Sequence, residues 1–126
     1  MICCPVLSLE HLAKLVENYR GDLNADIREF KIGSQHFAFN SLPHFMGVVN
    51  LSPDSWYRES VCLTTKSAVE RGQLLIKQGA HLVDLGGEST VLDAERVDAK
   101  DQSARLVPVI KELAQTAILV SAETYK

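Results

Sequence analysis

Cysteine is scarce in this sequence, and the few cysteines form no framework. Cys3 and Cys4 are adjacent, Cys62 stands alone, and no CxxC pair occurs. An odd count with this spacing argues against a disulfide-stabilised domain and against a zinc site. We therefore expect reduced thiols, as in a cytosolic protein.

Long runs of one chemical character are also missing. The 13 basic and 16 acidic residues give a formal net charge of −3, without a cluster of Lys and Arg. The sequence thus lacks the basic footprint of a nucleic-acid-binding protein. No apolar run approaches the roughly 20 residues of a membrane-spanning helix, and the N-terminus lacks the pattern of an export signal. We expect a cytoplasmic protein with neither nucleic acid nor membrane as a partner.

The composition is that of a folded domain. The 126 residues are 46% hydrophobic and 23% charged, which is typical of one soluble globular domain with a real core. Residues 8–20 place their apolar side chains on one helical stripe, with Ser8 as the cap and Gly21 as the stop. Residues 27–40 alternate apolar and polar on both sides of the Gly-Ser pair at 33–34, which predicts a β-hairpin.

After the hairpin the pattern changes. Residues 45–50, 81–87 and 117–124 are short apolar runs, typical of parallel strands that are covered on both faces. Between them, residues 65–79 and 102–115 have the periodicity of helices. Because each crossover carries a helix, we predict an α/β fold with parallel strands and right-handed connections.

Three residues give these helices more detail. Gly79 is a suitable C-cap for the first helix. Gly72 inside it costs about 1 kcal/mol of helix propensity, so we expect a close helix–strand approach there. Pro108 is expected to kink the second helix. The sequence stops at Lys126 directly after a strand, and we expect further βα units beyond it.

Polar side chains gather where the three strands end. Asn50 opens "NLSPDSW", residues 88–90 are the Glu, Ser and Thr of "DLGGEST", and Glu123 lies in "SAET". Ligands of parallel α/β folds bind at the C-terminal ends of the strands. The amide of Asn50 can coordinate a hard cation through its oxygen, and it can also bond to a heterocycle or a phosphate.

Each of these features alone has a plainer explanation, because Asn, Ser, Pro, Asp and Gly end strands for local backbone reasons. We interpret Asp84 as a strand residue with a backbone or hydroxyl partner, and His36, His44 and His81 as structural. The conjunction of three polar tips, each at the same end of its strand, favours a ligand pocket that Asn50 faces.

Three motifs resemble dihydropteroate synthase and, more loosely, the wider pterin-binding family. "MGVVNLSPDSW" is similar to M-G-I-L-N-V-T-P-D-S-F, "GAHLVDLGGEST" to G-A-D-I-I-D-V-G-G-E-S-T, and "LVSAETYK" to I-S-V-D-T-Y-K. They occur in the family's order, and the match covers about residues 36–126. Residues 1–21, with the opening helix, lie outside it, and residues 22–126 would form the N-terminal portion of a pterin-binding barrel.

The resemblance implies a partial TIM (β/α)8 barrel, with its first three parallel βα strands preceded by a helix and a hairpin that closes the barrel floor. A complete barrel takes about 250 residues, so we do not expect this chain to catalyse a reaction by itself. The full-length protein would condense 6-hydroxymethyl-7,8-dihydropterin pyrophosphate with p-aminobenzoate to dihydropteroate, with Mg²⁺, in folate biosynthesis. The resemblance also allows a homodimer.

The resemblance further implies roles for individual residues. Asn50 would bind magnesium and pyrophosphate, and Thr90 would lie on a second loop beside the pyrophosphate. Glu123 falls where the family has an Asp that bonds to the amino-pyrimidine edge of the pterin, and Trp56 replaces a Phe that walls the aminobenzoate site. The complete set of expected substrate-binding residues is Asn50, Ser52, Asp54, Trp56, Glu88, Ser89, Thr90 and Glu123, with Asn50 as the metal ligand.

Three positions depart from the family pattern. Arg58 stands where the family has an Asp near the developing cation, Val91 replaces an anion-binding Arg, and Glu123 is one methylene longer than Asp. These departures keep an alternative open, namely a non-catalytic pterin-binding homologue or a scaffold domain with degenerate catalytic loops.

Overall fold

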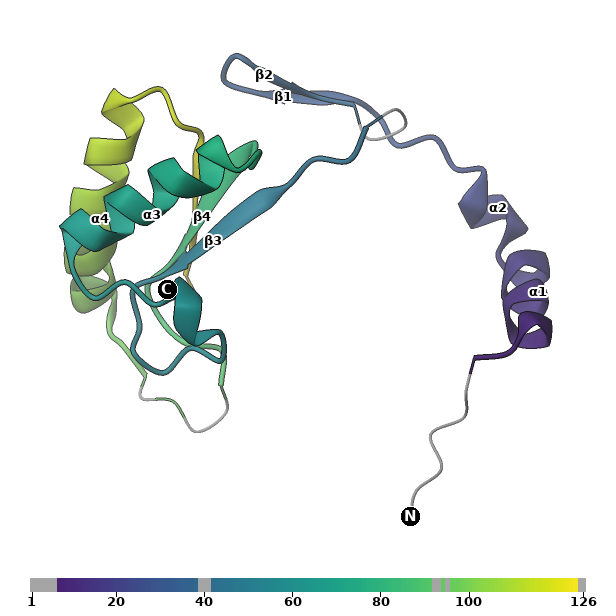
Figure 1. Cartoon of the computed structure of the whole chain (residues 1–126), viewed down its shortest axis with the longest axis horizontal. Helices are drawn as coiled ribbons and strands as arrows, with labels where there is room; N and C mark the ends of the chain where they lie inside the picture. Colours follow the sequence, from purple (N-terminus) through teal and green to yellow (C-terminus); the bar gives the residue numbers. More distant parts are fainter. Residues whose placement is uncertain (1–6, 39–41, 92–93, 95, 125–126) are drawn as a thin grey trace.

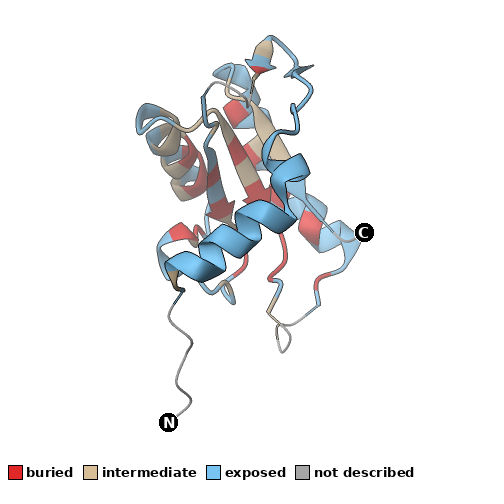
Figure 2. Ribbon diagram, turned by 90° about the vertical axis from the view of Figure 1, so that its right-hand side faces the viewer, coloured by how far each residue is buried: buried red, intermediate tan, exposed pale blue. Residues whose placement is uncertain are grey.

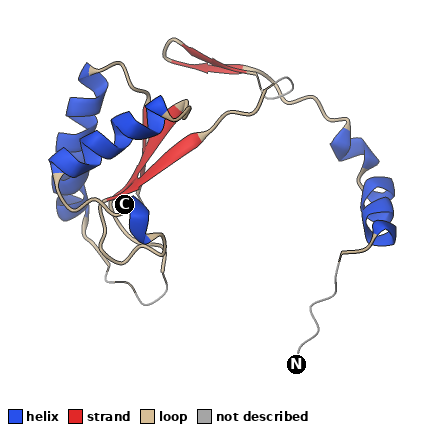
Figure 3. Ribbon diagram, in the orientation of Figure 1, coloured by secondary structure: helices blue, strands red, loops and turns tan. Residues whose placement is uncertain are grey.

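The computed structural model describes residues 7–38, 42–91, 94 and 96–124, so Cys3 and Cys4 lie outside the described residues. A helical segment and a hairpin precede alternating strands and helices (Figures 1 and 3). In chain order the elements are α1 (Leu9–Asn18), α2 (Arg20–Leu23), β1 (Phe30–Ile32), β2 (Gln35–Phe37), β3 (Met46–Asn50), the 3-10 helix η1 (Arg58–Ser60), α3 (Thr65–Lys77), β4 (Leu82–Gly86), α4 (Ala99–Gln115) and β5 (Val120–Glu123).

The central sheet has the predicted topology. Its three strands lie in the order β3-β4-β5, and both neighbouring pairs are parallel. Helices α3 and α4 cross over between successive strands and pack on one face of the sheet (Figure 1). The prediction of an α/β fold with parallel strands is confirmed.

Alternate residues of each strand form the core beneath the helices. Val49 of β3 and Val83 and Leu85 of β4 are fully buried and meet Leu113 of α4 in one cluster. Figure 2 shows this burial as bands across the sheet and the two helices. Because successive side chains point to opposite faces of a strand, the intervening positions form a second, more open face that includes Val48, which is 39% exposed.

Two glycines permit the helices to lie this close. A Cβ on Gly47 of β3 would lie 2.9 Å from the Leu75 Cβ of α3, so β3 and α3 approach closely at this point. A Cβ on Gly72 would meet Leu113 of α4 at 3.1 Å and Val83 of β4 only at 3.7 Å. The expected close helix–strand approach at Gly72 is therefore chiefly a helix–helix approach, because the side chain of Leu113 fills the space above it.

The helix ends follow ordinary capping chemistry. The Thr64 side chain accepts a hydrogen bond from the Ser67 backbone at the start of α3, and Gly79 follows its end with φ +105°, a left-handed conformation that suits glycine. Helix α4 begins at Ala99, earlier than residue 102, because the Asp98 side chain accepts a hydrogen bond from the Asp101 backbone.

Helices α1 and α2 stand apart from the sheet (Figure 1). Ser8 caps α1 as predicted, but Gly21 does not stop the helix, since it lies inside α2. Every residue of α1 and α2 is exposed. The hairpin β1-β2 is confirmed, with Gly33 at φ +59° in its turn, and this turn lines a cavity with the segments that precede β4 and β5.

The predicted structural role of the histidines is also confirmed. His81 accepts a hydrogen bond from the Phe45 backbone, His44 accepts one from the Ala38 backbone, and His36 pairs with Glu29 at 3.1 Å. Within the described residues, no helix combines the length and the apolar character that crossing a membrane requires.

Candidate functional site

The register of the sheet places two polar tips in one row. Asn50 of β3 pairs with Gly86 of β4, and Gly86 pairs with Glu123 of β5. Residues in one such row project to the same face of the sheet. Glu88, the polar residue predicted at the end of the second strand, lies two residues past this row. The third member of the row is therefore a glycine, Gly86.

Gly86 leaves a space that the two polar side chains share. A Cβ on Gly86 would lie 3.0 Å from the Asn50 Oδ1 atom and 3.9 Å from the Glu123 Oε2 atom. Both oxygens are hydrogen-bond acceptors, and they approach the same point above the strand. This point can therefore accept N–H donors or a hard cation.

A pocket of about 170 Å³ lies at these strand ends. It brings together most of the residues that the sequence predicted, drawn from β3, from the segments after β3 and β4, and from β5. Its lining residues are Asn50, Ser55, Trp56, Tyr57, Glu88, Ser89, Thr90 and Glu123. The sequence did not anticipate Ser55 and Tyr57 in this set.

Ser52 and Asp54 are not among the lining residues. Ser52 is 3% exposed, and its hydroxyl accepts a 3.4 Å hydrogen bond from the Asp54 backbone. The Asp54 carbonyl in turn accepts a 3.0 Å hydrogen bond from the Ser89 hydroxyl. The Asp54 carbonyl thus ties the segment after β3 to the segment after β4, and Ser52 forms its contact within the segment after β3.

The side chain of Asn50 has a fixed partner. Its Nδ2 atom donates a 2.7 Å hydrogen bond to the Ser60 hydroxyl, which donates to the Tyr57 carbonyl at 2.6 Å. The backbone is also tied here, because Cys62 N donates to the Asn50 carbonyl at 2.8 Å. The end of β3 and helix η1 thus form one hydrogen-bonded unit.

Glu88 lines the pocket, but its carboxylate is engaged elsewhere. Its side chain is 3% exposed and accepts hydrogen bonds from Arg96 at 2.9 Å and from Gln102 at 2.6 Å. The Gln102 Oε1 atom accepts a 2.8 Å hydrogen bond from the Thr124 hydroxyl. Glu88 therefore links the segment after β4, the start of α4 and the tip of β5.

Of two of the departures, Arg58 has a clear local role for its side chain, whereas Val91 contributes a backbone contact. The Arg58 guanidinium donates to the Pro53 carbonyl, so it braces the segment after β3. The Val91 backbone N–H donates to the Ser89 hydroxyl at 3.3 Å. Arg58 and Val91 are both absent from the pocket lining.

Exposed aromatic side chains flank the pocket. Trp56 is 83% exposed and Tyr57 is 56% exposed. The Tyr57 hydroxyl donates to Glu59 at 2.6 Å, and this hydrogen bond, together with the negative charge of Glu59, raises the pKa of Tyr57 above 10.0. Tyr57 therefore remains a neutral donor at physiological pH.

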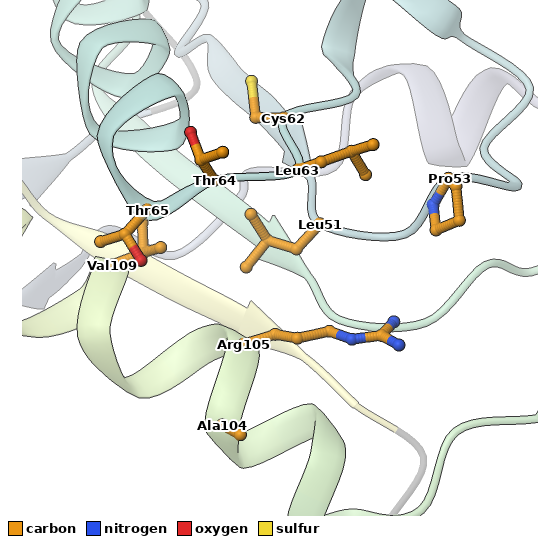
Figure 4. A pocket seen from close by; sticks show the side chains of 9 residues that line it. All are labelled: Leu51, Pro53, Cys62, Leu63, Thr64, Thr65, Ala104, Arg105 and Val109. Atoms are coloured by element: carbon orange, nitrogen blue, oxygen red, sulfur yellow. The ribbon is translucent and has the colours of Figure 1, made fainter.

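A second cavity of about 340 Å³ lies between α4 and the segment from Leu51 to Thr65 (Figure 4). Arg105 runs from α4 to the segment after β4, where it donates to the Gly87 carbonyl at 3.2 Å. Cys62 lines this cavity, and burial raises the pKa of its thiol. The cavity holds none of the residues that the sequence placed in the site.

Sequence reasoning missed Ser60, Arg96 and Gln102. Each is a common polar residue outside the three motifs, and each acts through a hydrogen bond to a motif residue. One signal was available in the sequence: Gln102 lies four residues before Leu106, on the apolar stripe of its helix, although Gln is mostly exposed in folded proteins.

Comparison with known proteins identifies a matching family and similar relatives. A family model described as "Pterin binding enzyme" matches residues 46–126. A dihydropteroate synthase of Streptococcus pyogenes is 37% identical over 97 residues, which is 76% of this chain and 36% of that protein. The chain therefore spans about a third of the length of this relative.

Solved structures agree with these sequence matches. A Yersinia pestis dihydropteroate synthase in a sulfonamide drug complex superposes with a TM-score of 0.71 at 31% identity, covering 79% of this chain and 36% of that one. A Xanthomonas albilineans dihydropteroate synthase with 4-aminobenzoic acid gives a TM-score of 0.64 at 36% identity, covering 78% and 36%. These neighbours are TIM barrels, and this chain has the fold of part of one.

Proposed function

Because this chain belongs to the pterin binding enzyme family, we propose that the full-length protein is a dihydropteroate synthase. It would join 6-hydroxymethyl-7,8-dihydropterin pyrophosphate to p-aminobenzoate and release pyrophosphate, a transferase reaction of folate biosynthesis. The relatives that share these motifs carry that name, and one solved neighbour holds 4-aminobenzoic acid.

One observation carries the proposal. The Asn50 amide oxygen and the Glu123 carboxylate approach the same point above Gly86, at the C-terminal edge of the sheet. The Glu123 carboxylate suits the donors on the amino-pyrimidine edge of a pterin, and the Asn50 amide oxygen beside it suits the metal ion that accompanies the pyrophosphate. A pocket with these two residues on opposite rims would have excluded the assignment.

The other lining residues extend this arrangement to the remaining parts of the substrates. Thr90 offers a hydroxyl for the pyrophosphate, beside Ser89. Trp56 presents an exposed aromatic surface on the opposite segment, which suits the flat ring of p-aminobenzoate. In the reaction the amino nitrogen forms a bond to the pterin methylene carbon, the carbon–oxygen bond to pyrophosphate breaks, and the amino group loses a proton.

The donor set also fits Mg²⁺. Asn50 Oδ1 is a hard oxygen ligand that faces the pocket, and Mg²⁺ typically binds through one or two protein oxygens together with substrate phosphates. Among the described residues no three His, Cys, Asp or Glu side chains cluster as a metal site. When bound, it would stabilise negative charge on the departing pyrophosphate.

A second candidate function is a pterin-binding homologue without turnover, or a scaffold. The arrangement around Arg58 and Val91 favours it, because Arg58 is bound to the Pro53 carbonyl and Val91 offers no cation for an anion.

We also propose that the full-length protein is cytoplasmic and forms a homodimer.

The deciding experiment adds pterin pyrophosphate and labelled p-aminobenzoate to the full-length protein with Mg²⁺. Formation of dihydropteroate supports the synthase. Binding of the pterin without product supports the non-catalytic homologue, and the absence of both would leave only a scaffold. An Asn50→Ala variant serves as the matched control for site-dependent turnover.

A further inference from the structure

Ser60 occupies a special place beside the pocket, outside all three motifs. It is fully buried, with 0% exposure, at the end of η1. Its hydroxyl takes part in two hydrogen bonds, one to the Tyr57 carbonyl at 2.6 Å and one from the Asn50 amide at 2.7 Å. Ser60 thus lies between the segment after β3 and a side chain of the site.

The direction of these two hydrogen bonds is fixed by chemistry. A carbonyl oxygen can only accept, so the single proton of the Ser60 hydroxyl is donated to Tyr57. The Ser60 oxygen is then an acceptor toward Asn50, and the Asn50 group that faces it has to be the NH₂. The Asn50 oxygen must therefore face the other way, toward Gly86, where a Cβ would lie 3.0 Å from it.

We propose that Ser60 is a positioning residue that sets the polarity of the Asn50 amide, so that its oxygen and not its NH₂ is presented to the ligand. This inference rests on the proposed function for the identity of the ligand. It assigns to Ser60 no contact with the substrate.

The orientation of the Asn50 amide matters because Glu123 lies in the same row of the sheet. The Glu123 Oε2 atom approaches the same point above Gly86. If the amide turned over, its NH₂ would face the Glu123 carboxylate and could donate a hydrogen bond to it. The carboxylate would then be occupied, and the Asn50 oxygen would face Ser60 instead of the ligand. With Ser60 in place, both oxygens remain available to a cation or to N–H donors.

Main-chain hydrogen bonds fix the position of Ser60 relative to the end of β3. Ser60 N donates to the Tyr57 carbonyl at 3.0 Å, and Cys62 N donates to the Asn50 carbonyl at 2.8 Å. Asn50 also forms a parallel bridge with Val61. The distance between η1 and the end of β3 is therefore set by main-chain contacts, and the hydroxyl adds only the orientation of the amide.

The test uses Ser60→Ala in the full-length protein, with two kinds of readout. The first is the side-chain amide signal of Asn50 in ¹⁵N NMR, identified by its loss in Asn50→Asp. The second is the affinity for pterin pyrophosphate with Mg²⁺, compared with 6-hydroxymethylpterin, which lacks the pyrophosphate. Ser67→Ala is the matched control, because it also removes a serine hydroxyl, one that bonds to Thr64 in the cap of α3 and to the Cys62 thiol.

We expect Ser60→Ala to shift the Asn50 amide signal and to weaken Mg²⁺-dependent binding of pterin pyrophosphate by about 10–100-fold, as for other groups that orient a metal ligand. Binding of 6-hydroxymethylpterin should change less than about twofold, well under the tenfold that corresponds to 1.4 kcal/mol. Ser67→Ala should change neither.

The Asn50→Asp background separates polarity from packing. A carboxylate presents an oxygen in either orientation, so Ser60→Ala should have little further effect on Mg²⁺ dependence there. An equal loss in both backgrounds, or an unchanged Asn50 signal in Ser60→Ala, would overturn the inference. If the wild-type protein bound neither pterin, the proposed function would fail, and the Asn50 signal alone would still decide the role of Ser60.

Discussion

The amide oxygen of Asn50 and the carboxylate of Glu123 meet above Gly86, although the two residues lie 73 positions apart in the sequence (123 minus 50). The parallel register brings them together, because Asn50, Gly86 and Glu123 form one row across β3, β4 and β5. The missing side chain of the central residue is what leaves room for both oxygens.

Gly86→Ala tests this shared space. The new Cβ would lie 3.0 Å from the Asn50 oxygen, so the amide has to move, and we expect the affinity for pterin pyrophosphate with Mg²⁺ to fall about tenfold, or 1.4 kcal/mol. Isothermal titration of the full-length protein measures it.

Gly87→Ala is the matched control. Its Cβ would meet Leu106 of α4 at 3.2 Å, under the helices, so this variant should lose about 1–2 kcal/mol of stability through overpacking and keep its affinity. Equal affinities of the Gly86 and Gly87 variants would contradict the arrangement described for the row.

Glu88→Gln tests the buried network behind the pocket. A glutamine offers one acceptor where Arg96 and Gln102 require two, and it turns an NH₂ toward one of these donors. We expect a loss of about 1.5–3 kcal/mol in the free energy of unfolding, chiefly from the Gln102 contact, because Arg96 is 58% exposed and solvent screens its share.

Urea denaturation of the full-length protein measures this loss. Glu112→Gln on the exposed face of α4 is the control and should stay within about 0.5 kcal/mol of the wild type. A Glu88→Gln midpoint equal to that of the control would show that the network contributes nothing to stability.

Gly47→Ala tests the contact between β3 and α3. The added Cβ would lie 2.9 Å from two carbons of Leu75, so the helix or the strand has to shift, and overpacking of this kind costs about 1–3 kcal/mol. The thermal midpoint should fall accordingly. Gly21→Ala, with no atom within 4 Å of its Cβ and a helical position in α2, should instead gain up to about 1 kcal/mol. A drop of the same size in both would refute the specific contact.

The sequence predicted the parallel sheet well because the strands are short, mostly apolar runs and helix α3 between the first two carries recognisable caps. Thr64 and Gly79 are local signals that act within a few residues of themselves. Gly21 misled the interpretation, because a glycine ends a helix by adopting a left-handed conformation, whereas Gly21 is a helical residue of α2.

The site was predicted only in part, for a different reason. Asn50, Thr90 and Glu123 stand in recognisable motifs, and they do line one pocket. The orientation of their side chains depends on residues that no motif contains, such as Ser60 and Gln102. The role of Gly86 follows from strand register, which the sequence leaves uncertain by a residue or two, and a shift of one residue reverses the face.

The hydrogen bond from Ser60 to the Tyr57 carbonyl has a consequence for how the two substrates would affect each other's binding. Trp56, an exposed aromatic side chain, is the chain neighbour of Tyr57, so the hydrogen bonds through Tyr57, Ser60 and Asn50 connect the proposed p-aminobenzoate wall to the amide of the site. Binding of p-aminobenzoate beside Trp56 should then change the affinity for the pterin, even without a reaction. Pterin affinities that are identical with and without p-aminobenzoate would show that binding at the two substrate positions is not coupled.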